Sequence, residues 1–356
     1  MTMVGTVTIS IEIELGWGLV RFDKFDKLSE NREAETRHLS RLLDQCEEYD
    51  VPITFNIVGH LLHESCDGTH DGPHDEGWWD VDPGTSVEED PEFYAPDLID
   101  DIRSRRTDHE ICTHTYSHIE CNEVDPEIVR WELNRAQRVH DEHGLGKTGS
   151  IVPPRHSTPP SDVLVDTGIR TKRTPHYKAH DEDHPATAVG KLYDILFGSH
   201  PAVEPAVRQG VLESYSPEYI TFAAPFLQTG TSEPHPVYRS IPLFVRQRLH
   251  ERNLRRGIDA AATTDSFVHY WSHLYDFSNE KQWPQVESFV RQLAERQEMG
   301  DIRVRTMKDL QSEYEQRAPH DDHSAQAQQD DLCPTREVGQ PKPANASLDR
   351  PFDHDA

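Results

Sequence analysis

Short apolar runs alternate along this chain with longer stretches in which apolar residues recur every three or four positions. The short runs predict buried β-strands, and the longer stretches predict amphipathic helices. Leu39, Leu42 and Leu43, for example, lie on one stripe of a predicted helix. The predicted strands are residues 6–13, 51–58, 110–113, 150–153, 169–174, 266–273 and 302–305. The predicted helices are residues 29–49, 94–106, 125–143, 286–300 and 307 onward.

This alternation predicts an α/β fold with a parallel sheet that is either open or closed into a barrel. Two stretches interrupt the pattern: residues 60–92 are rich in His, Asp, Gly and Pro, and residues 175–260 have no clear period. We therefore expect one domain over residues 1–317 with irregular insertions at these two places. In residues 318–356 large apolar residues are scarce, which predicts a disordered, acidic C-terminal tail.

Two polar motifs follow predicted strands. Glu12 and Glu14 end the first apolar run, and alternate residues of a strand share a face, about 7 Å apart. His114 and His118, after the third strand, have a spacing at which both imidazoles reach one ion from a single helical turn. Two acids and a histidine pair can form a divalent metal site with a general base beside it. This combination is typical of a hydrolase.

Two further candidates also lie at strand ends. Arg155 follows the strand at 150–153, and His273 ends the strand at 266–273. Active sites of parallel α/β folds lie at the carboxyl ends of the strands. We therefore expect all four segments to meet at one rim of the sheet.

The motifs Glu12-Ile13-Glu14 and His114-Thr115-Tyr116-Ser117-His118 resemble the first two motifs of the polysaccharide deacetylase (NodB-like) family, with glutamate at both acidic positions. The resemblance extends over roughly residues 4–315. It implies a distorted (β/α) barrel of about seven parallel strands. It also implies a metal, usually zinc, held by Glu14, His114 and His118, with Glu12 as the general base.

The same resemblance suggests roles for residues near the later strands. The family's third motif carries an arginine that positions the base, and Arg155 is the candidate, although it follows the two prolines rather than preceding them. The last motif carries a histidine that acts as general acid. His273 at the rim is the candidate, and His269, deeper in the same strand, is expected to be a core or supporting histidine.

Several tryptophans are candidates for substrate contact, because exposed aromatic rings commonly stack on sugars. Trp17 follows the first motif, Trp271 lies between the two histidines of the late strand, and Trp78 and Trp79 lie in the insertion at 60–92. Packing alone is an equally good interpretation of Trp271, and simple anchoring of the loop is the alternative for Trp78.

Two other groups have the composition of metal sites. His63, Cys66, His70 and His74 lie close together in sequence, but their irregular, Gly-rich context favours a solvated lid or substrate loop, with a second metal as the alternative. Cys112 and Cys121 flank the histidine motif, so a structural Cys/His zinc is a rival interpretation of it.

The amino-acid composition limits which partners the protein can bind. Asp and Glu number 64 against 36 Lys and Arg, for a net charge of −28, so nucleic acid and anionic membranes are unfavourable partners. Nine of the 36 cations are lysine, and such an acid-rich, lysine-poor chain resembles proteins from salt-loving archaea and other salt-loving microbes. Five cysteines without a CxxC motif favour a reduced, cytoplasmic setting, and we expect no signal peptide or membrane span.

These observations together predict a zinc-dependent hydrolase that removes an acetyl group from an N-acetylated sugar or glycoconjugate. Two alternatives stay open at this stage. One is a hydrolase of a non-sugar amide on the same scaffold, and the other is a non-catalytic carbohydrate-binding protein. The oligomeric state is not predicted.

Overall fold

The computed structural model describes residues 4–176, 193, 196–198, 200–218, 221–264 and 266–317. The predicted tail at 318–356 lies outside the described residues, as does part of the predicted insertion at 175–260.

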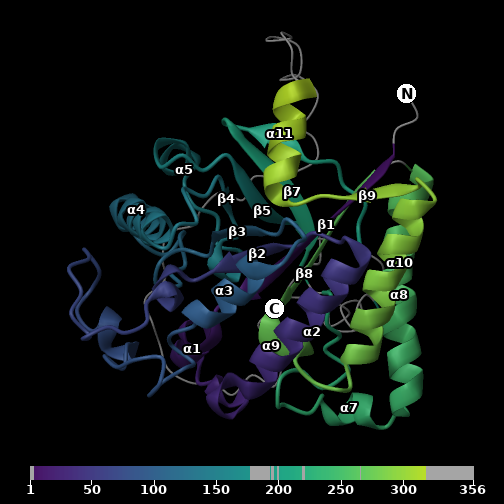
Figure 1. Ribbon diagram of the computed structural model, residues 1–356, viewed down its shortest axis with the longest axis horizontal. Helices are drawn as coiled ribbons and strands as arrows, with labels where there is room; N and C mark the ends of the chain where they lie inside the picture. Colours follow the sequence, from purple (N-terminus) through teal and green to yellow (C-terminus); the bar gives the residue numbers. More distant parts are fainter. Residues whose placement is uncertain are drawn as a thin grey trace, which may run out of the picture.

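In the described part of the chain, nine strands form a single sheet (Figure 1). The strands are β1 (Gly5–Ile13), β2 (Thr54–Ile57), β3 (Glu110–Thr113), β4 (Ser150–Ile151), β5 (Thr171–His176), β6 (Ala206–Arg208), β7 (Val211–Pro217), β8 (Phe267–His273) and β9 (Ile302–Val304). Their order is β6-β7-β5-β4-β3-β2-β1-β8, and β9 also pairs with β1. All the pairings are parallel except that of β6 with β7.

Helices lie around the outside of this sheet, with α2, α8 and α10 beside one another near β1 and α4 and α5 on the other side (Figure 1). The α-helices are α1 (Leu15–Leu19), α2 (Glu33–Tyr49), α3 (Pro96–Ser104), α4 (Pro126–Glu142), α5 (Ser161–Asp166), α7 (Pro236–Arg239), α8 (Leu243–Thr264), α9 (Leu274–Phe277), α10 (Trp283–Glu298) and α11 (Met307–Arg317). The 3₁₀ turns are η1 (Val20–Phe22), η2 (Phe25–Lys27), η3 (Glu30–Arg32), η4 (Gly59–Leu62), η5 (Trp78–Val81) and η6 (Pro154–His156). Among the described helices, none is both long and apolar enough to cross a membrane.

Side chains bring β7 and β8 together, although these two strands are not neighbours in the hydrogen-bonded order. The hydroxyl of Ser214 lies 2.5 Å from His269 Nδ1, and the indole of Trp271 donates to the carbonyl of Pro217 at 2.6 Å. The sheet is therefore curled into a distorted barrel that side chains, rather than a strand ladder, hold closed between β7 and β8.

The central strand β1 is buried on both faces, and its two faces differ in chemistry. Val7, Ile9 and Ile11 belong to the main apolar core. Ser10, on the alternate face, makes hydrogen bonds within the barrel, because its hydroxyl lies 3.2 Å from Arg173 Nη1 and 2.9 Å from His269 Nε2. The barrel interior is thus polar, and it leads to the carboxyl ends of the strands.

The predicted α/β class and the mostly parallel sheet are confirmed. The sequence pattern left residues 175–260 without elements, yet they contain β7, which pairs with β5 along its length, and α8, which is the longest described helix. β7 was missed because its interior polar residues, such as Glu213 and Ser214, break the apolar run that identifies a buried strand.

Candidate active site

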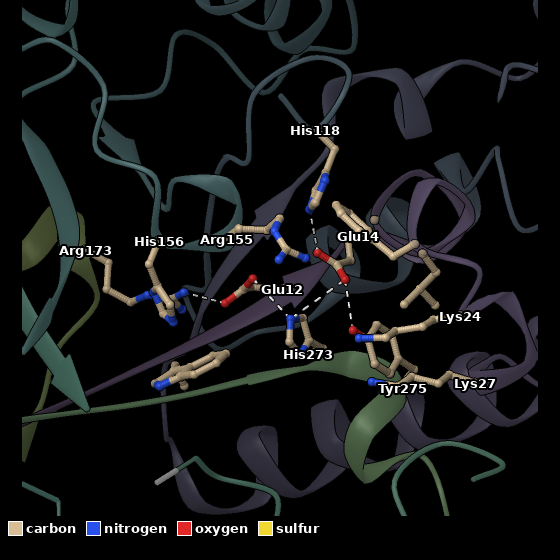
Figure 2. A pocket seen from close by; sticks show the side chains of 14 residues that line it. Glu12, Glu14, Lys24, Lys27, His118, Arg155, His156, Arg173, His273 and Tyr275 are labelled. Atoms are coloured by element: carbon tan, nitrogen blue, oxygen red, sulfur yellow. Dashed lines mark hydrogen bonds and ion pairs between the residues drawn. The ribbon is translucent and has the colours of Figure 1, made fainter. Parts of the chain in front are cut away.

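The end of β1 places two carboxylates in one pocket (Figure 2). Glu12 is the penultimate residue of β1 and is in register with His273 of β8. Glu14 follows the strand and caps α1 with a helical backbone. Gly18, one turn later, permits this position, because a Cβ on it would lie 2.2 Å from the Glu14 carboxyl carbon.

The two motif histidines lie on a loop after β3. Thr115 and His118 have φ angles of 60° and 61°, a left-handed conformation that is unusual for residues with a Cβ. The predicted single helical turn is therefore wrong at this segment. The carboxylate of Glu132 on α4 stabilises the loop instead, since it accepts the backbone N–H groups of Tyr116 and Ser117 at 2.7 and 2.8 Å.

Glu14, His114 and His118 lie close enough to share an ion, and all three are buried. Glu14 Oε2 lies 2.8 Å from His118 Nε2 and 3.5 Å from His114 Nε2. His114 donates from Nδ1 to the carbonyl of Val152 at 2.6 Å, which leaves its buried Nε2 without a hydrogen-bond partner. One carboxylate and two imidazole nitrogens, with one nitrogen unpartnered, suit a zinc-type ion with open coordination positions.

Glu12 lies beside these ligands and is held by an arginine. Arg173 Nη2 is 2.5 Å from Glu12 Oε1, and the other oxygen lies 3.4 Å from His114 Nε2 and 3.6 Å from His273 Nε2. Burial opposes ionisation of Glu12, but Arg173, His273 and His114 outweigh it and lower the pKa to about 2. Glu12 is therefore an ionised carboxylate that is available to accept a proton.

The arginine on Glu12 differs from the one expected. Arg155 lines the pocket, but its guanidinium pairs with Glu120 at 3.1 Å and lies over the ring of Phe22. Arg173 of β5 occupies the expected position instead, only 2% exposed. A cation inside a predicted strand was a signal in the sequence, but nothing in the sequence indicated which acid it meets.

His273 faces the carboxylates, as expected of a rim residue. Its Nε2 lies 3.8 Å from Glu14 Oε1, and its Nδ1 lies 2.8 Å from Asp276 Oδ2. Burial opposes its protonation, but Glu14, Glu12 and Asp276 raise the pKa to about 9. His269 is fully buried between Ser214 and Ser10 and lies outside the pocket lining.

The tryptophans occupy three different settings. Trp17 is fully buried, donates to the carbonyl of Phe93 at 3.3 Å and does not line the pocket, so the structure contradicts its predicted contact with substrate. Trp78 is half-buried outside the pocket and donates to Ser117 at 2.9 Å, which supports the anchoring interpretation. Trp271 lines the pocket but is 1% exposed and stacks with Arg173.

The sequence did not predict several other residues of the pocket. Tyr275 donates to Glu14 Oε1 at 2.9 Å and stacks on His273. Lys24 and Lys27 lie beyond Tyr275 in Figure 2 and give this strongly acidic protein a cationic side to its pocket. His156 packs against the ring of Trp271 on the opposite side.

Neither cysteine beside the histidine motif joins a metal-type cluster in the described residues. Cys112 and Cys121 are both buried, at 0% and 1% exposure, and burial raises the pKa of each thiol. Burial without ligand partners favours a packing role for both.

Comparison with known proteins agrees with this geometry. Residues 22–169, under half of the chain, match the family model described as Polysaccharide deacetylase. The matched stretch contains His114, His118 and Arg155 and begins after both motif glutamates. No protein of curated function matches this chain.

Solved structures share the fold at low sequence identity. A protein from Mycobacterium smegmatis described as a polysaccharide deacetylase has a TM-score of 0.56 at 15% identity, over 88% of this chain and 90% of that one. One from Pseudomonas aeruginosa PAO1 with the same description has a TM-score of 0.54 at 13% identity, over 88% and 92%. An allantoinase has a TM-score of 0.53 at 12% identity, over 88% and 91%. The predicted NodB-like fold is thus confirmed.

Proposed function

We propose that this chain is a metal-dependent hydrolase of the polysaccharide deacetylase type, which removes an N-acetyl group from a sugar or glycoconjugate. One observation supports the proposal above the others. Three buried ligand groups, Glu14, His114 and His118, lie beside a carboxylate, Glu12, that an arginine holds ionised. A metal site with a separate, preoriented base is suited to metal-assisted hydrolysis of an amide by water.

The ligand set favours zinc. Bound to Glu14, His114 and His118, a zinc ion would supply Lewis-acid chemistry for the acetyl carbonyl and would acidify the attacking water. The residues of the chain perform the remaining tasks. Glu12 takes the proton of the attacking water, and Arg173 keeps this carboxylate charged and oriented through its 2.5 Å contact.

The leaving amine needs a proton, and His273 is placed to supply it. Its pKa is raised to about 9, so the imidazolium is present at neutral pH, and Asp276 fixes the ring through Nδ1. Nε2 lies 3.6 Å from Glu12 Oε2 and 3.8 Å from Glu14 Oε1 (Figure 2). Base and acid thus lie side by side at the ends of β1 and β8, where one substrate group can contact both.

A non-sugar amide is the second candidate substrate. The shared fold includes a protein named as an allantoinase, and the pocket wall nearest the carboxylates is formed by fully or nearly buried side chains, including Trp271. We place the sugar first because the family match carries the deacetylase description.

Metal analysis and acetate release test the proposal together. The wild-type protein, purified in high salt without an affinity-column metal, should carry zinc at the Glu14 site and release acetate from N-acetylglucosamine oligomers. Glu14→Ala should lose both metal and activity, whereas Glu12→Gln should keep the metal and lose activity.

Other outcomes separate the alternatives. Sugar binding without acetate release in every preparation would indicate a carbohydrate-binding protein. Metal-dependent hydrolysis of small amides such as allantoin, without activity on acetylated sugars, would favour the second candidate. Unchanged metal content in both Glu14→Ala and His114→Ala would overturn the ligand assignment.

A further inference from the structure

A second cluster of metal-type ligands lies in the segment between β2 and α3, drawn in blue at the left of Figure 1. His60, Cys66, His70 and Asp82 each place one ligand atom within 4.8 Å of the others. His60 and the Asp82 carboxylate are fully buried, and the His70 side chain is 5% exposed. These three side chains are thus shielded from solvent, although residues 64, 65, 67–69 and 71 beside them are exposed, as predicted for a solvated loop.

Two distances within the cluster match those between the ligands of a tetrahedral ion. His60 Nε2 lies 3.3 Å from Asp82 Oδ2, and Cys66 Sγ lies 3.7 Å from His70 Nε2. Around zinc, with bonds of about 2.0–2.3 Å, neighbouring ligand atoms lie roughly 3.3–3.6 Å apart. His70 Nε2 lies 2.6 Å from Asp82 Oδ2, so this nitrogen would move away from the carboxylate by roughly 1 Å to reach that spacing.

Unpartnered nitrogens in the cluster point to an ion. The fully buried His60 makes no well-aligned hydrogen bond from either ring nitrogen, although Nε2 lies 3.3 Å from the Asp82 carboxylate. An unsatisfied buried imidazole is costly, and coordination would satisfy it.

The environment of Asp82 supports the same conclusion. Its Oδ1 accepts from the hydroxyl of Tyr94 at 2.9 Å and from the backbone of Gly84 at 3.1 Å. These bonds orient Oδ2 toward the two imidazoles, as outer partners orient a ligating carboxylate.

The local backbone brings the two halves of the cluster together. Gly68 and Gly84, at φ of 75° and 64°, approach each other so closely that a Cβ on Gly84 would lie 3.3 Å from the Gly68 nitrogen. A bridge between Ser65 and Ser86 and the bond from Cys66 N–H to the Thr85 carbonyl at 2.9 Å close the same loop. The ligands are thus held from both sides of one turn.

We propose that His60, Cys66, His70 and Asp82 form a second metal site that binds a structural zinc ion, distinct from the site at Glu14. One thiolate, two imidazoles and one carboxylate form a donor set that suits zinc. Four protein ligands fill a tetrahedral shell and leave no position for a substrate, so the ion is structural. This inference rests on a separate set of residues and is independent of the proposed deacetylase activity.

This ion would fasten the insertion to the back of the active site. The ring of His60 packs on Trp17 at 4.4 Å, and His70 stacks on Trp79 at 4.1 Å. Trp17 lies three residues after Glu14, so the zinc cluster supports the segment that carries a proposed catalytic ligand. The ion therefore connects residues 63–94 to η4, which follows β2. Residues 63–94 contain few apolar side chains that could make this connection by packing.

Metal stoichiometry and cobalt absorption on the full chain test this site. We expect two zinc ions per chain in the wild type and one in Cys66→Ser. Reconstitution with cobalt(II) should give a near-ultraviolet thiolate charge-transfer band that is lost in Cys66→Ser and weakened or shifted in Asp82→Asn. Cys121→Ser and Cys333→Ser, the matched controls, should keep the band.

Glu14→Ala separates the two sites. It should lose one ion and keep the thiolate band. The band therefore tests the second site even if Glu14 is not a metal ligand. Circular dichroism on each variant checks that the chain is folded. If folded Cys66→Ser and Asp82→Asn both retain the wild-type zinc content, or if the cobalt protein shows no band that depends on Cys66, the second site does not exist.

Discussion

The guanidinium of Arg173 lies 2.5 Å from the carboxylate of Glu12, which joins a cation on β5 to an acid on β1 across the barrel interior. Arg173 also contacts the hydroxyl of Ser10 and the ring of Trp271. The contact between Arg173 and Glu12 determines two properties of the proposed base: its charge and its direction.

Replacing Arg173 should therefore reduce activity and shift its pH dependence. In Arg173→Gln the charge and the contact with Glu12 Oε1 are lost, and we expect kcat/KM to fall by about 10–100-fold. Arg173 lowers the pKa of Glu12, so its removal raises that pKa, and the acidic limb of the pH–rate profile moves to higher pH. Arg155→Gln is the control, because the Arg155 guanidinium pairs with Glu120, and it should leave the acidic limb in place. Equal shifts in both variants would contradict this role.

Gly18→Ala should displace a metal ligand without unfolding the protein. The added methyl would lie 2.2 Å from the Glu14 carboxyl carbon, and the flexible side chain of Glu14 moves more easily than the backbone does. We expect the variant to lose active-site zinc, measured by elemental analysis, while it keeps its circular dichroism spectrum. Gly149→Ala, whose methyl would meet only the end of the Gln311 side chain, is the matched control. Full zinc content in Gly18→Ala would argue against Glu14 as a ligand.

Asp276→Asn should lower the fraction of His273 that is protonated at high pH. The Asp276 carboxylate contributes to the raised pKa of His273, so the substitution lowers that pKa. Since the protonated imidazole is the active form, the alkaline limb of kcat/KM should move to lower pH. We expect little loss near neutral pH and a loss that grows as the pH rises toward 9, whereas His273→Ala should lose about 10²–10⁴-fold at neutral pH. An alkaline limb that stays at the wild-type pH in Asp276→Asn would remove His273 from the proposed role.

Buried histidines should make the protein sensitive to acid. His140 on α4 is fully buried, and burial lowers its pKa to about 4, whereas an unfolded histidine has a pKa near 6.5. Between these values the unfolded chain binds more protons, so the free energy of unfolding falls as pH falls from about 6.5 toward 4. The contribution of one such histidine at pH 5 is about 2 kcal/mol.

Urea denaturation at pH 7.5 and pH 5 measures this effect. His140→Leu should lose about 2 kcal/mol less than the wild type between the two conditions, whatever its stability at pH 7.5. The exposed His176 provides the control, and His176→Leu should lose as much stability as the wild type does. The same pH dependence in wild type and His140→Leu would show that the buried ring is charged in the native state.

Local patterns pointed to the proposed ligands of the main site because those residues are close in sequence. Glu12 and Glu14 lie two positions apart at the end of an apolar run, and His114 and His118 lie on one loop after a strand. A parallel sheet brings the carboxyl ends of its strands to one edge. The two motifs could therefore be placed in one site without an exact prediction of the strand order.

Conformation within the motif was harder to predict. The histidine loop is not helical, because Thr115 and His118 have left-handed backbones and Glu132, from a different element, binds the N–H groups of the two residues between them, Tyr116 and Ser117. The burial of Trp17 likewise depends on His60 and Phe93, which reach it from other segments. Propensity and periodicity describe a residue's own neighbours in sequence and contain no information on such partners.

The sequence alone determined the α/β class, the parallel sheet and the proposed metal ligands, since each depends on residues within one element or on alternation along the chain. Only the tertiary structure showed that Arg173, rather than Arg155, meets Glu12, and that His60 and Asp82 join Cys66 and His70. Both results depend on contacts between side chains that are far apart in the sequence. The curvature of the barrel and the closure of the loops decide which side chains meet. Charge pairing and desolvation then fix the chemistry of each site, because they act through space and not along the chain.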